Sequence, residues 1–326
     1  EMGIQDNFWT IGEEAVAWGT KAATLTRGIE NQTDDATPNI EHMQSRGMRP
    51  ATVATPTGRS VAVERGGQHV ITVDLMNKSL GLLLAGVAST VATTTPVGAT
   101  NARLHTFTPT TSGPIKSFTL HAGRVSVDGT TNHHDYLGAM VESLNLSLSP
   151  KGLPVLKNTY QYKTLDTAAA SVTPSYPTTP TIYTDTDCVV TIGGSSECLR
   201  SSDFTIPTGL DMERWRICAG GREKPILNTR VEPTGTLSLD FDGDTWQNSW
   251  IAGTELEDLV ITFTGGEIEA GFDFFFRATF PLIQLTGSSP KVGLDMTPEQ
   301  PLPFRVLDNL TDPAWTLEYQ TSDAAY

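Results

Sequence analysis

The stretch Gly138-Ala-Met-Val-Glu-Ser-Leu-Asn-Leu-Ser147 decides the fold class, because it recurs without a gap as Arg277-Ala-Thr-Phe-Pro-Leu-Ile-Gln-Leu-Thr286. Both runs end in the alternation of apolar and polar residues that is typical of a half-buried β-strand. The chain therefore contains the same strand pattern twice, once near its middle and once near its end.

A second pair of matching segments precedes these two runs. Thr72-Val-Asp-Leu75 is followed by Gly86, twelve residues after the aspartate, and Ser238-Leu-Asp-Phe241 is followed by Gly253, thirteen residues after the aspartate. Each pair has the pattern of a strand, a helical or coiled crossing and then a glycine. The sequence predicts two diverged copies of one β-rich unit, and a chain with two copies of a ring-forming unit closes a ring with half as many subunits.

Outside these segments the composition is that of an all-β protein with minor α content. Clusters of Thr, Gly and Pro separate short apolar runs, as expected for many strands and turns. One short helix per copy is expected, at Asn77–Val87 and at Asp244–Gly253. Strands are expected at 60–64, 69–75, 117–121, 140–147, 189–192, 236–241, 259–264, 272–285 and 315–319.

The domain boundary is expected in a Thr/Pro-rich linker at 166–187, which is too proline-rich for a core strand. This divides the chain into a first unit at 1–165 and a second unit at 188–326. Residues 31–58 and 90–102 are expected to be long loops. Loops of this length usually contact something, although the alternative of mobile surface loops remains open.

Composition excludes several classes of function. The 326 residues contain 22 Lys and Arg against 37 Asp and Glu, a net charge of −15, so the chain should repel nucleic acids and anionic membranes. The longest apolar candidate, Leu80–Ala85, is far shorter than the roughly 20 residues of a membrane-spanning helix, and no leader opens the chain, so a soluble protein is expected. Cys188, Cys198 and Cys218 lack metal-site spacing and are expected to be free thiols.

Candidate chemical motifs are weak. His133-His134-Asp135 is expected at the tip of a hairpin, because adjacent side chains on an extended segment point to opposite faces and cannot share a metal. The carboxylates of Asp240–Asp244 lack the glycine and glutamate positions of a calcium loop. The run Gly193–Glu197 lacks the second glycine of a nucleophile elbow. We expect no enzyme, no cofactor and no metal site.

One long segment, 231–276, has ten acidic residues and no Lys or Arg. Within its strand patterns, Asp240 and Asp242 share one face, and Glu267 and Glu269 share another, because side chains alternate along a strand. This acidic face is either an ordinary solvated surface or a surface that must not adhere to a passing polyanion.

The chain resembles the tail tube, or major tail, proteins of long-tailed, non-contractile bacteriophages. The resemblance covers nearly the whole chain in the order and spacing of weak motifs: Glu13-Glu-Ala-Val-Ala-Trp-Gly-Thr20, Arg46-Gly-Met-Arg49, Lys78-Ser-Leu-Gly-Leu-Leu-Leu84, Phe118-Thr-Leu120 to Gly123, Tyr136-Leu-Gly138, Phe280-Pro-Leu-Ile-Gln-Leu-Thr-Gly287 and Pro303-Phe304.

The resemblance implies two tandem β-sandwich or half-barrel units, each with a short flanking helix, that close into a ring-shaped β-barrel on assembly. It implies a structural virion protein whose stacked rings form the tail tube through which genome DNA leaves. Implied partners are further copies of the chain, as a homotrimeric pseudo-hexameric ring or alternatively a homohexamer, together with the tape-measure, tail-terminator and distal tail proteins. The location is the virion tail, after assembly in the host cytoplasm, with no membrane contact and no specific DNA binding.

Two sets of site residues follow from this picture. Asp240, Asp242, Glu267 and Glu269 are expected to line an acidic channel, and a ring of three chains has a charge of 3 × −15 = −45. If six units each contribute about four inner strands, roughly 24 strands tilted by about 40° give a backbone diameter of about 48 Å, which is wider than a DNA duplex. Contacts between rings are expected from the 31–58 loop, through Met43, Gln44, Arg46 and Arg49.

Two other functions are compatible with a β-rich chain. A carbohydrate-binding or adhesin-type β-sandwich would share the Thr/Gly-rich strands and would use tryptophans as stacking platforms, and a hydrolase would need a catalytic triad or metal signature. The sequence shows no such signature. The tryptophans are far apart in the sequence, at Trp9, Trp18, Trp215, Trp246, Trp250 and Trp315.

Overall fold

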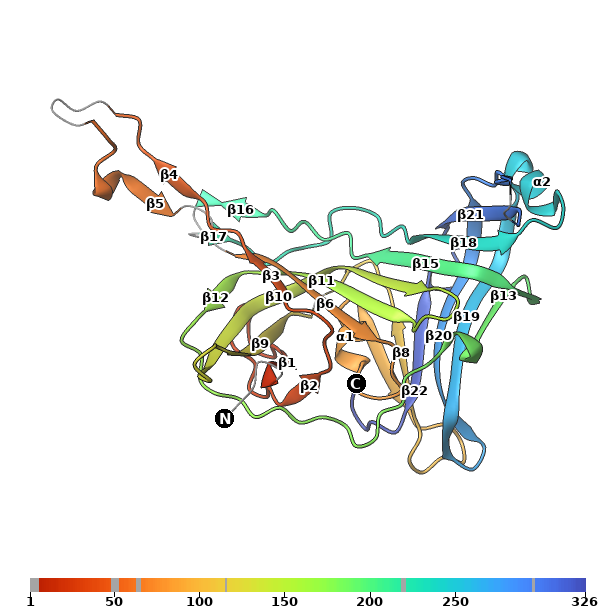
Figure 1. Cartoon of the computed structure of the whole chain (residues 1–326), viewed down its shortest axis with the longest axis horizontal. Helices are drawn as coiled ribbons and strands as arrows, with labels where there is room; N and C mark the ends of the chain where they lie inside the picture. The colour runs from red at the N-terminus through yellow and green to blue at the C-terminus, as the bar shows by residue number, and fades with distance from the viewer. Residues whose placement is uncertain (1–5, 48–52, 63–65, 115, 218–220, 295–296) are drawn as a thin grey trace.

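The computed structural model describes residues 6–47, 53–62, 66–114, 116–217, 221–294 and 297–326 (Figure 1). In the first half the elements are β1 (Phe8–Glu13), β2 (Arg27–Ile29), β3 (Asp35–Pro38), β4 (His42–Gln44), β5 (Ser60–Ala62), β6 (Gly67–Asp74), α1 (Gly81–Ala85), β7 (Thr90–Thr94), β8 (Arg103–Thr108), β9 (Phe118–Val125), β10 (Thr131–Leu148), β11 (Val155–Tyr162) and β12 (Thr164–Asp166).

In the second half they are β13 (Cys188–Ile192), β14 (Ser195–Glu197), β15 (Leu199–Pro207), β16 (Trp215–Arg216), β17 (Gly221–Arg222), β18 (Thr234–Asp240), α2 (Thr245–Ala252), β19 (Glu255–Glu269), β20 (Phe272–Leu285), β21 (Glu299–Val306) and β22 (Thr316–Thr321). Apart from the two small ribbons β4–β5 and β16–β17, antiparallel pairings join the strands into one large sheet that curls on itself. The expectation of a β-rich protein with little helix is confirmed.

The backbone of this sheet is the strand order β3–β6–β11–β10–β15–β18–β21–β20–β19–β13. The two halves of the chain meet where β10 pairs with β15, from Ser143 opposite Pro207 to Leu148 opposite Ser202. Most of the other strands branch from β10 and β20. The N-terminal part of β10 pairs with β9 and β12. The N-terminal part of β20 pairs with β22, β22 pairs with β8, and β8 pairs with β7.

The two halves repeat the same local order. Strands β3–β6–β11–β10 in the first half correspond to β15–β18–β21–β20 in the second, and both β3–β6 and β15–β18 are hairpins that enclose a long excursion of the chain. The runs matched in sequence also share their burial pattern. Val141, Leu144 and Leu146 are buried in β10, and Phe280, Ile283 and Leu285 are buried at the matching positions of β20.

The two helices occupy matching places in the sequence but different environments. Every residue of α1 is buried, because its sequence Gly-Leu-Leu-Leu-Ala is apolar on all sides. No residue of α2 is buried, and this helix ends at Gly253, whose φ of 66° is the left-handed conformation that favours glycine at a helix C-terminus. The short helix predicted after each first strand is therefore present in both halves.

Two stretches expected to be loops contain strands. Residues 31–58 include β3 and β4, and residues 90–102 include β7. These polar, Thr-rich segments form strands because each one pairs along one edge only: β3 with β6, β4 with β5 and β7 with β8. The 166–187 segment is extended and lies against the first half, where the backbone N–H of Gly28 donates to Ser175 O (2.9 Å) and that of Tyr183 donates to Leu75 O (3.0 Å).

Candidate functional site

A row of side chains crosses eight strands on the sheet face opposite the core. Residues that pair directly from strand to strand are Thr72, Lys157, Asn145, Thr205, Thr234, Arg305, Gln284 and Glu255. Neighbouring positions on the same face include Ser147, Asp203, Thr236, Ser238 and Asp240, while the alternating positions Leu146, Phe204 and Phe304 are buried. We call this surface the polar face. It arises because polar and apolar residues alternate on each strand.

The carboxylates of the polar face accept hydrogen bonds from amides, hydroxyls and one arginine. Asn145 Nδ2 donates to both oxygens of Asp203 (3.2 and 3.1 Å), and Gln161 Nε2 donates to Glu142 Oε2 (2.9 Å). Ser238 Oγ donates to Glu299, and the Arg200 side chain forms an ion pair with Asp240.

Lys157 and Arg305 are the two cations in the row itself, and Arg305 donates to Gln284 Oε1 (2.6 Å). Amide and hydroxyl donors fix the positions of carboxylates without cancelling their charge. The face therefore presents hydroxyls, amides and charges of both signs, with the exposed cations Lys157 and Arg305 among more numerous carboxylates.

The four predicted acidic residues lie in two separate places. Asp240 ends β18 on the polar face, and Asp242 is exposed just beyond it. Glu267 and Glu269 lie at the far end of β19, a strand of 15 residues that spans about 45 Å. The structure therefore does not bring the two pairs together.

Glu269 is bound to a neighbouring loop. Its Oε1 accepts the backbone N–H groups of Ala102 (2.9 Å), Asn101 (2.8 Å) and Thr100 (2.7 Å). These hydrogen bonds lower the pKa of Glu269, the bond from Ala102 contributing most. Glu267 accepts the backbone N–H of Gly271 across the β19–β20 turn (2.9 Å). Both carboxylates thus organise turns at this end of the molecule.

The predicted loop contacts lie on a projecting ribbon. Met43 and Gln44 are in β4 rather than in a loop, Arg46 follows that strand, and Arg49 lies outside the described residues. Met43 pairs with Val61 of β5, and their side chains are 60% and 57% exposed. The ribbon extends away from the body of the molecule (Figure 1), so these apolar side chains have no cover within the described chain.

Sequence reasoning missed a buried carboxylate in the N-terminal motif. Glu14 accepts hydrogen bonds from the backbone N–H groups of Gly138 (2.7 Å) and Gly19 (2.8 Å) and from the hydroxyls of Ser117 (2.8 Å) and Thr119 (3.1 Å). The motif that carries the family resemblance therefore includes a structural clamp. Its signal in the sequence was the pair Glu13-Glu14 inside an otherwise apolar segment.

The histidine cluster is in a strand, not at a hairpin tip. His133, His134 and Asp135 belong to β10, because the turn before that strand is closed earlier, by the hydrogen bond from the backbone N–H of Gly129 to Ser126 O. Asp135 is buried and bonds the His121 ring (2.6 Å) and Lys21 Nζ (2.5 Å).

Among the described residues, no three His, Cys, Asp or Glu side chains are grouped so that they could hold a metal. Cys188 and Cys198 are free thiols, and burial raises the pKa of Cys188 to about 12, with a smaller contribution from Asp187. Cys218 lies outside the described residues.

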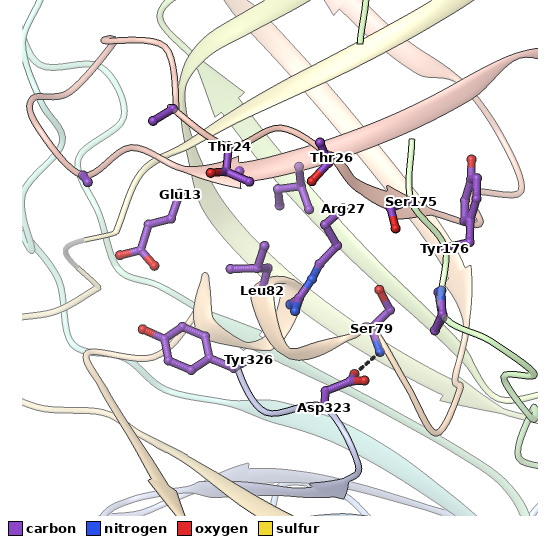
Figure 2. Close-up of a pocket in the computed structure, with 15 residues that line it drawn as sticks. Glu13, Thr24, Thr26, Arg27, Ser79, Leu82, Ser175, Tyr176, Asp323 and Tyr326 are labelled. Carbon is purple, nitrogen blue, oxygen red and sulfur yellow. Dashed lines mark hydrogen bonds between the residues drawn. The ribbon is translucent and has the colours of Figure 1, made fainter. Parts of the chain in front are cut away.

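A cavity of about 580 Å³ lies between β1, β2, the segment before α1 and the last residues of the chain. Figure 2 shows Arg27 reaching into it from β2, with Asp323 beneath. Arg27 Nη2 donates to Ala325 O (3.1 Å), and Asp323 accepts the backbone N–H of Ser79 (2.7 Å). The charged groups thus serve to tie the end of the chain to β2 and to the start of α1.

The tryptophans form no common platform. Trp9 and Trp315 are buried, and Trp246 and Trp250 pack partly against the core. The Trp18 indole donates to Gly138 O (2.8 Å), and Arg222 covers the Trp215 ring at 5.4 Å. This arrangement gives no support to the carbohydrate-binding alternative.

Comparison with known families agrees with the β-rich fold. No curated protein matches the sequence. None of the helices in the described part of the chain has the length and hydropathy needed to cross a bilayer. The family described as "Phage tail tube protein" matches residues 5–306, which is nearly the whole chain, and its members are structural rather than enzymatic. Tail tube proteins self-assemble into the tail tube of the virion, and this chain belongs to that family.

Proposed function

We propose that the chain forms stacked rings in the tail tube of a long-tailed, non-contractile phage, and that the polar face lines the channel for genome DNA. The observation that carries the proposal is the continuous row of polar side chains across eight strands, in a member of the tail tube family. The carboxylates of this face outnumber its cations, Lys157, Arg200 and Arg305, so the face as a whole should not bind phosphates strongly and DNA should slide past it. Tape-measure, terminator and distal tail proteins are the expected partners inside and at the ends of the tube.

The repeated strand order supports two tandem units, at 1–165 and 188–326, joined by the 166–187 segment. Each unit supplies four strands to the wall, β3–β6–β11–β10 and β15–β18–β21–β20. Three chains then supply six units, so we propose a pseudo-hexameric trimer, with six chains as the alternative. Native mass spectrometry of assembled rings should give about three times 35.1 kDa. Six times that mass would contradict the trimer, and a protein that forms no rings at high concentration would contradict the assembly itself.

Charge reversal on the polar face tests the channel. Replacing both Asp203 and Asp240 by lysine is expected to leave ring assembly intact and to make the tubes retain DNA at low salt, because each phosphate contact by a lysine releases condensed counterions. Wild-type tubes should retain none. Asp242, Glu267 and Glu269 remain further candidates for the lining, near the two ends of the sheet.

The matched control reverses Asp308 and Asp312, which are exposed in the loop between β21 and β22. DNA retention is measured by cosedimentation with assembled tubes at several salt concentrations. If the control variant retains as much DNA as the Asp203 and Asp240 variant, the polar face is not the channel lining.

The projecting β4–β5 ribbon is proposed to bridge successive rings. A two-stranded ribbon is marginally stable alone, and its exposed Met43–Val61 pair suits burial against another copy. Deleting residues 43–49 is therefore expected to leave folded subunits that no longer polymerise, as judged by circular dichroism and negative-stain microscopy. Tubes of normal length after the deletion would refute the bridging role.

A further inference from the structure

The two units differ where the wall strands of each unit end. In the first unit, Ser143–Leu148 of β10 pairs with β15, so the sheet continues into the second unit. The gapless sequence repeat aligns Ser143–Asn145 with Leu282–Gln284 of β20. These residues of β20 pair instead with Glu255–Glu257, the first residues of β19. The start of β19 therefore occupies the edge of β20 that corresponds to the edge of β10 on which β15 lies.

The start of β19 is an extension that the first unit lacks. β9 precedes β10 as β19 precedes β20, and it begins at Phe118, opposite Ala139. The residue of β20 that matches Ala139 is Ala278, which pairs with Ile261 of β19. Residues 255–260 of β19 therefore have no counterpart in β9. The first unit leaves this edge to the next unit, whereas the second unit covers it with its own backbone.

A closed ring needs the covered edge of β20. The proposed wall takes four strands from each unit, so β20 of one chain would be followed by β3 of the next chain, which is the counterpart of β15. β3 is available for this contact, because β6 is its only strand partner within the described part of the chain. An edge strand with unpaired backbone groups is a template for pairing with another chain. Glu255–Glu257 thus lie where β3 of the next chain would lie.

We call residues 244–257, which comprise α2 and the start of β19, the strap. α2 lies at one end of the molecule beside the ends of β18 and β21, and none of its residues is buried (Figure 1). The backbone N–H of Gly193 donates to Glu257 O (2.9 Å), and Gln284 Nε2 donates to Gly253 O (3.2 Å). The apolar side chains of the strap pack only partly against the core: Trp246, Trp250 and Leu256. Release of the strap would therefore uncover less apolar surface than release of a buried strand.

The strap ends at a hinge. Asp258 has a φ of 50°, a left-handed conformation that is uncommon for a residue other than glycine. The register places Asp258 opposite Pro281, which has no N–H to donate to the neighbouring strand. The pairs of the strap with β20 are thereby separated from the longer ladder that begins at Leu259. Glu255, Glu257 and Asp258 are all exposed, and repulsion between their like charges weakens the paired arrangement further.

We propose that the strap is a removable cap, which covers the edge of β20 in the free subunit and gives way to β3 of the next chain in the ring. The inference rests on the proposed tube function and goes beyond it, because it names a device that delays assembly and the strand that replaces it. In the free subunit the row of the polar face ends at Glu255. In the ring the row passes from Gln284 to the next chain, so that the four-strand sets of all units lie side by side.

A disulfide that locks the strap tests the proposal. Glu255 lies directly opposite Gln284, and such residues of antiparallel strands have Cβ atoms about 4.5–5.5 Å apart, close to the distance that a disulfide spans. E255C/Q284C, made in a C198S/C218S background, is expected to form rings when reduced. Oxidation should lower the ring fraction, measured by size-exclusion chromatography, by about tenfold, and subsequent reduction should restore it. Equal ring fractions before and after oxidation would overturn the release of the strap.

The matched control places the disulfide on the other side of the hinge. Val260 pairs with Thr279, so V260C/T279C in the same background joins the same two strands without holding the strap. This variant should form rings equally well when oxidised and when reduced. Equal losses of rings from the two oxidised variants would overturn the strap as the element that must move.

Hydrogen exchange tests the same step in the wild-type chain. In rings, compared with free subunits, the backbone amides of Asp35–Thr37 in β3 should gain protection and those of Glu255–Glu257 should lose it. Rings in which Glu255–Glu257 stay protected would overturn the strap alone. A wild-type chain that forms no rings at high concentration would overturn the proposed tube function, and the role of the strap with it.

Discussion

Replacing Glu14 by alanine is expected to lower the free energy of unfolding by about 3–5 kcal/mol, because several buried donors lose their acceptor together. The carboxylate accepts two backbone N–H groups, from Gly138 and Gly19, and two hydroxyls, from Ser117 and Thr119. Gly138 has a φ of 68° inside β10, so its N–H cannot turn to another partner without moving the strand. Urea unfolding followed by tryptophan fluorescence measures the change.

The neighbouring residue provides a matched control. Glu13 pairs with Lys116 (2.6 Å), and its side chain is 35% exposed, so solvent screens the interaction. Glu13→Ala should therefore cost about 1 kcal/mol or less. Equal losses for Glu13→Ala and Glu14→Ala would show that the hydrogen bonds of the buried carboxylate contribute little. Glu14→Gln should fall between the two, because an amide oxygen accepts fewer of the four hydrogen bonds.

The strands were predictable where one face is buried and the other is polar. Phe272–Leu285, in which buried positions alternate except at Pro281–Leu282, was predicted with its correct bounds, and each of the other expected strands overlaps an observed one. Strands with weaker alternation escaped prediction. Val155–Tyr162 carries polar Asn158 on its buried side, where the amide donates to Leu83 O (2.8 Å), so the apolar pattern is interrupted.

The candidate site was harder to predict than the fold. Asp240 could be placed on a polar strand face from alternation alone. The polar face as a whole could not, because its rows join strands that are far apart in sequence, such as Asn145 with Thr205 and Thr234 with Arg305. Register across such pairs depends on the packing of the core and not on local sequence. The hydrogen bonds through which Glu267 and Glu269 hold turns also could not be predicted, because their donors, such as Thr100, are not marked by any local pattern.

The second large effect is expected from acid. His69 is buried with both ring nitrogens lacking a hydrogen-bond partner among the described residues, and its ring lies 4.4 Å from that of Trp9 and 5.0 Å from that of Tyr136. Desolvation lowers the pKa of His69 from 6.5 to about 4, with Asp34 raising it and Arg124 lowering it to smaller extents. Asp34 is already engaged by Arg124, so it cannot readily compensate an imidazolium.

The sign of the pH dependence follows from these values. Because the pKa of His69 is lower in the folded protein than in the unfolded chain, its contribution to stability is complete above pH 6.5 and is lost as the pH falls toward about 4. The loss amounts to about 3 kcal/mol, since each pKa unit corresponds to about 1.4 kcal/mol. The pKa values of His105, His133 and His134 are also lowered, mainly by desolvation, so they contribute in the same direction.

Substitution separates His69 from the other histidines. His69→Phe keeps an aromatic ring between Trp9 and Tyr136 and removes the titrating group. Between pH 7 and pH 4 the free energy of unfolding should therefore fall less in this variant than in the wild type, the difference being about 3 kcal/mol. His133→Gln, at a partly exposed position, should change this slope only slightly. Because His69 lies opposite Ala36 in the hairpin that carries the β4–β5 ribbon, protection of the β3–β6 amides from hydrogen exchange should weaken first in acid. Parallel pH profiles for wild type and His69→Phe would show that the buried imidazole does not set acid stability.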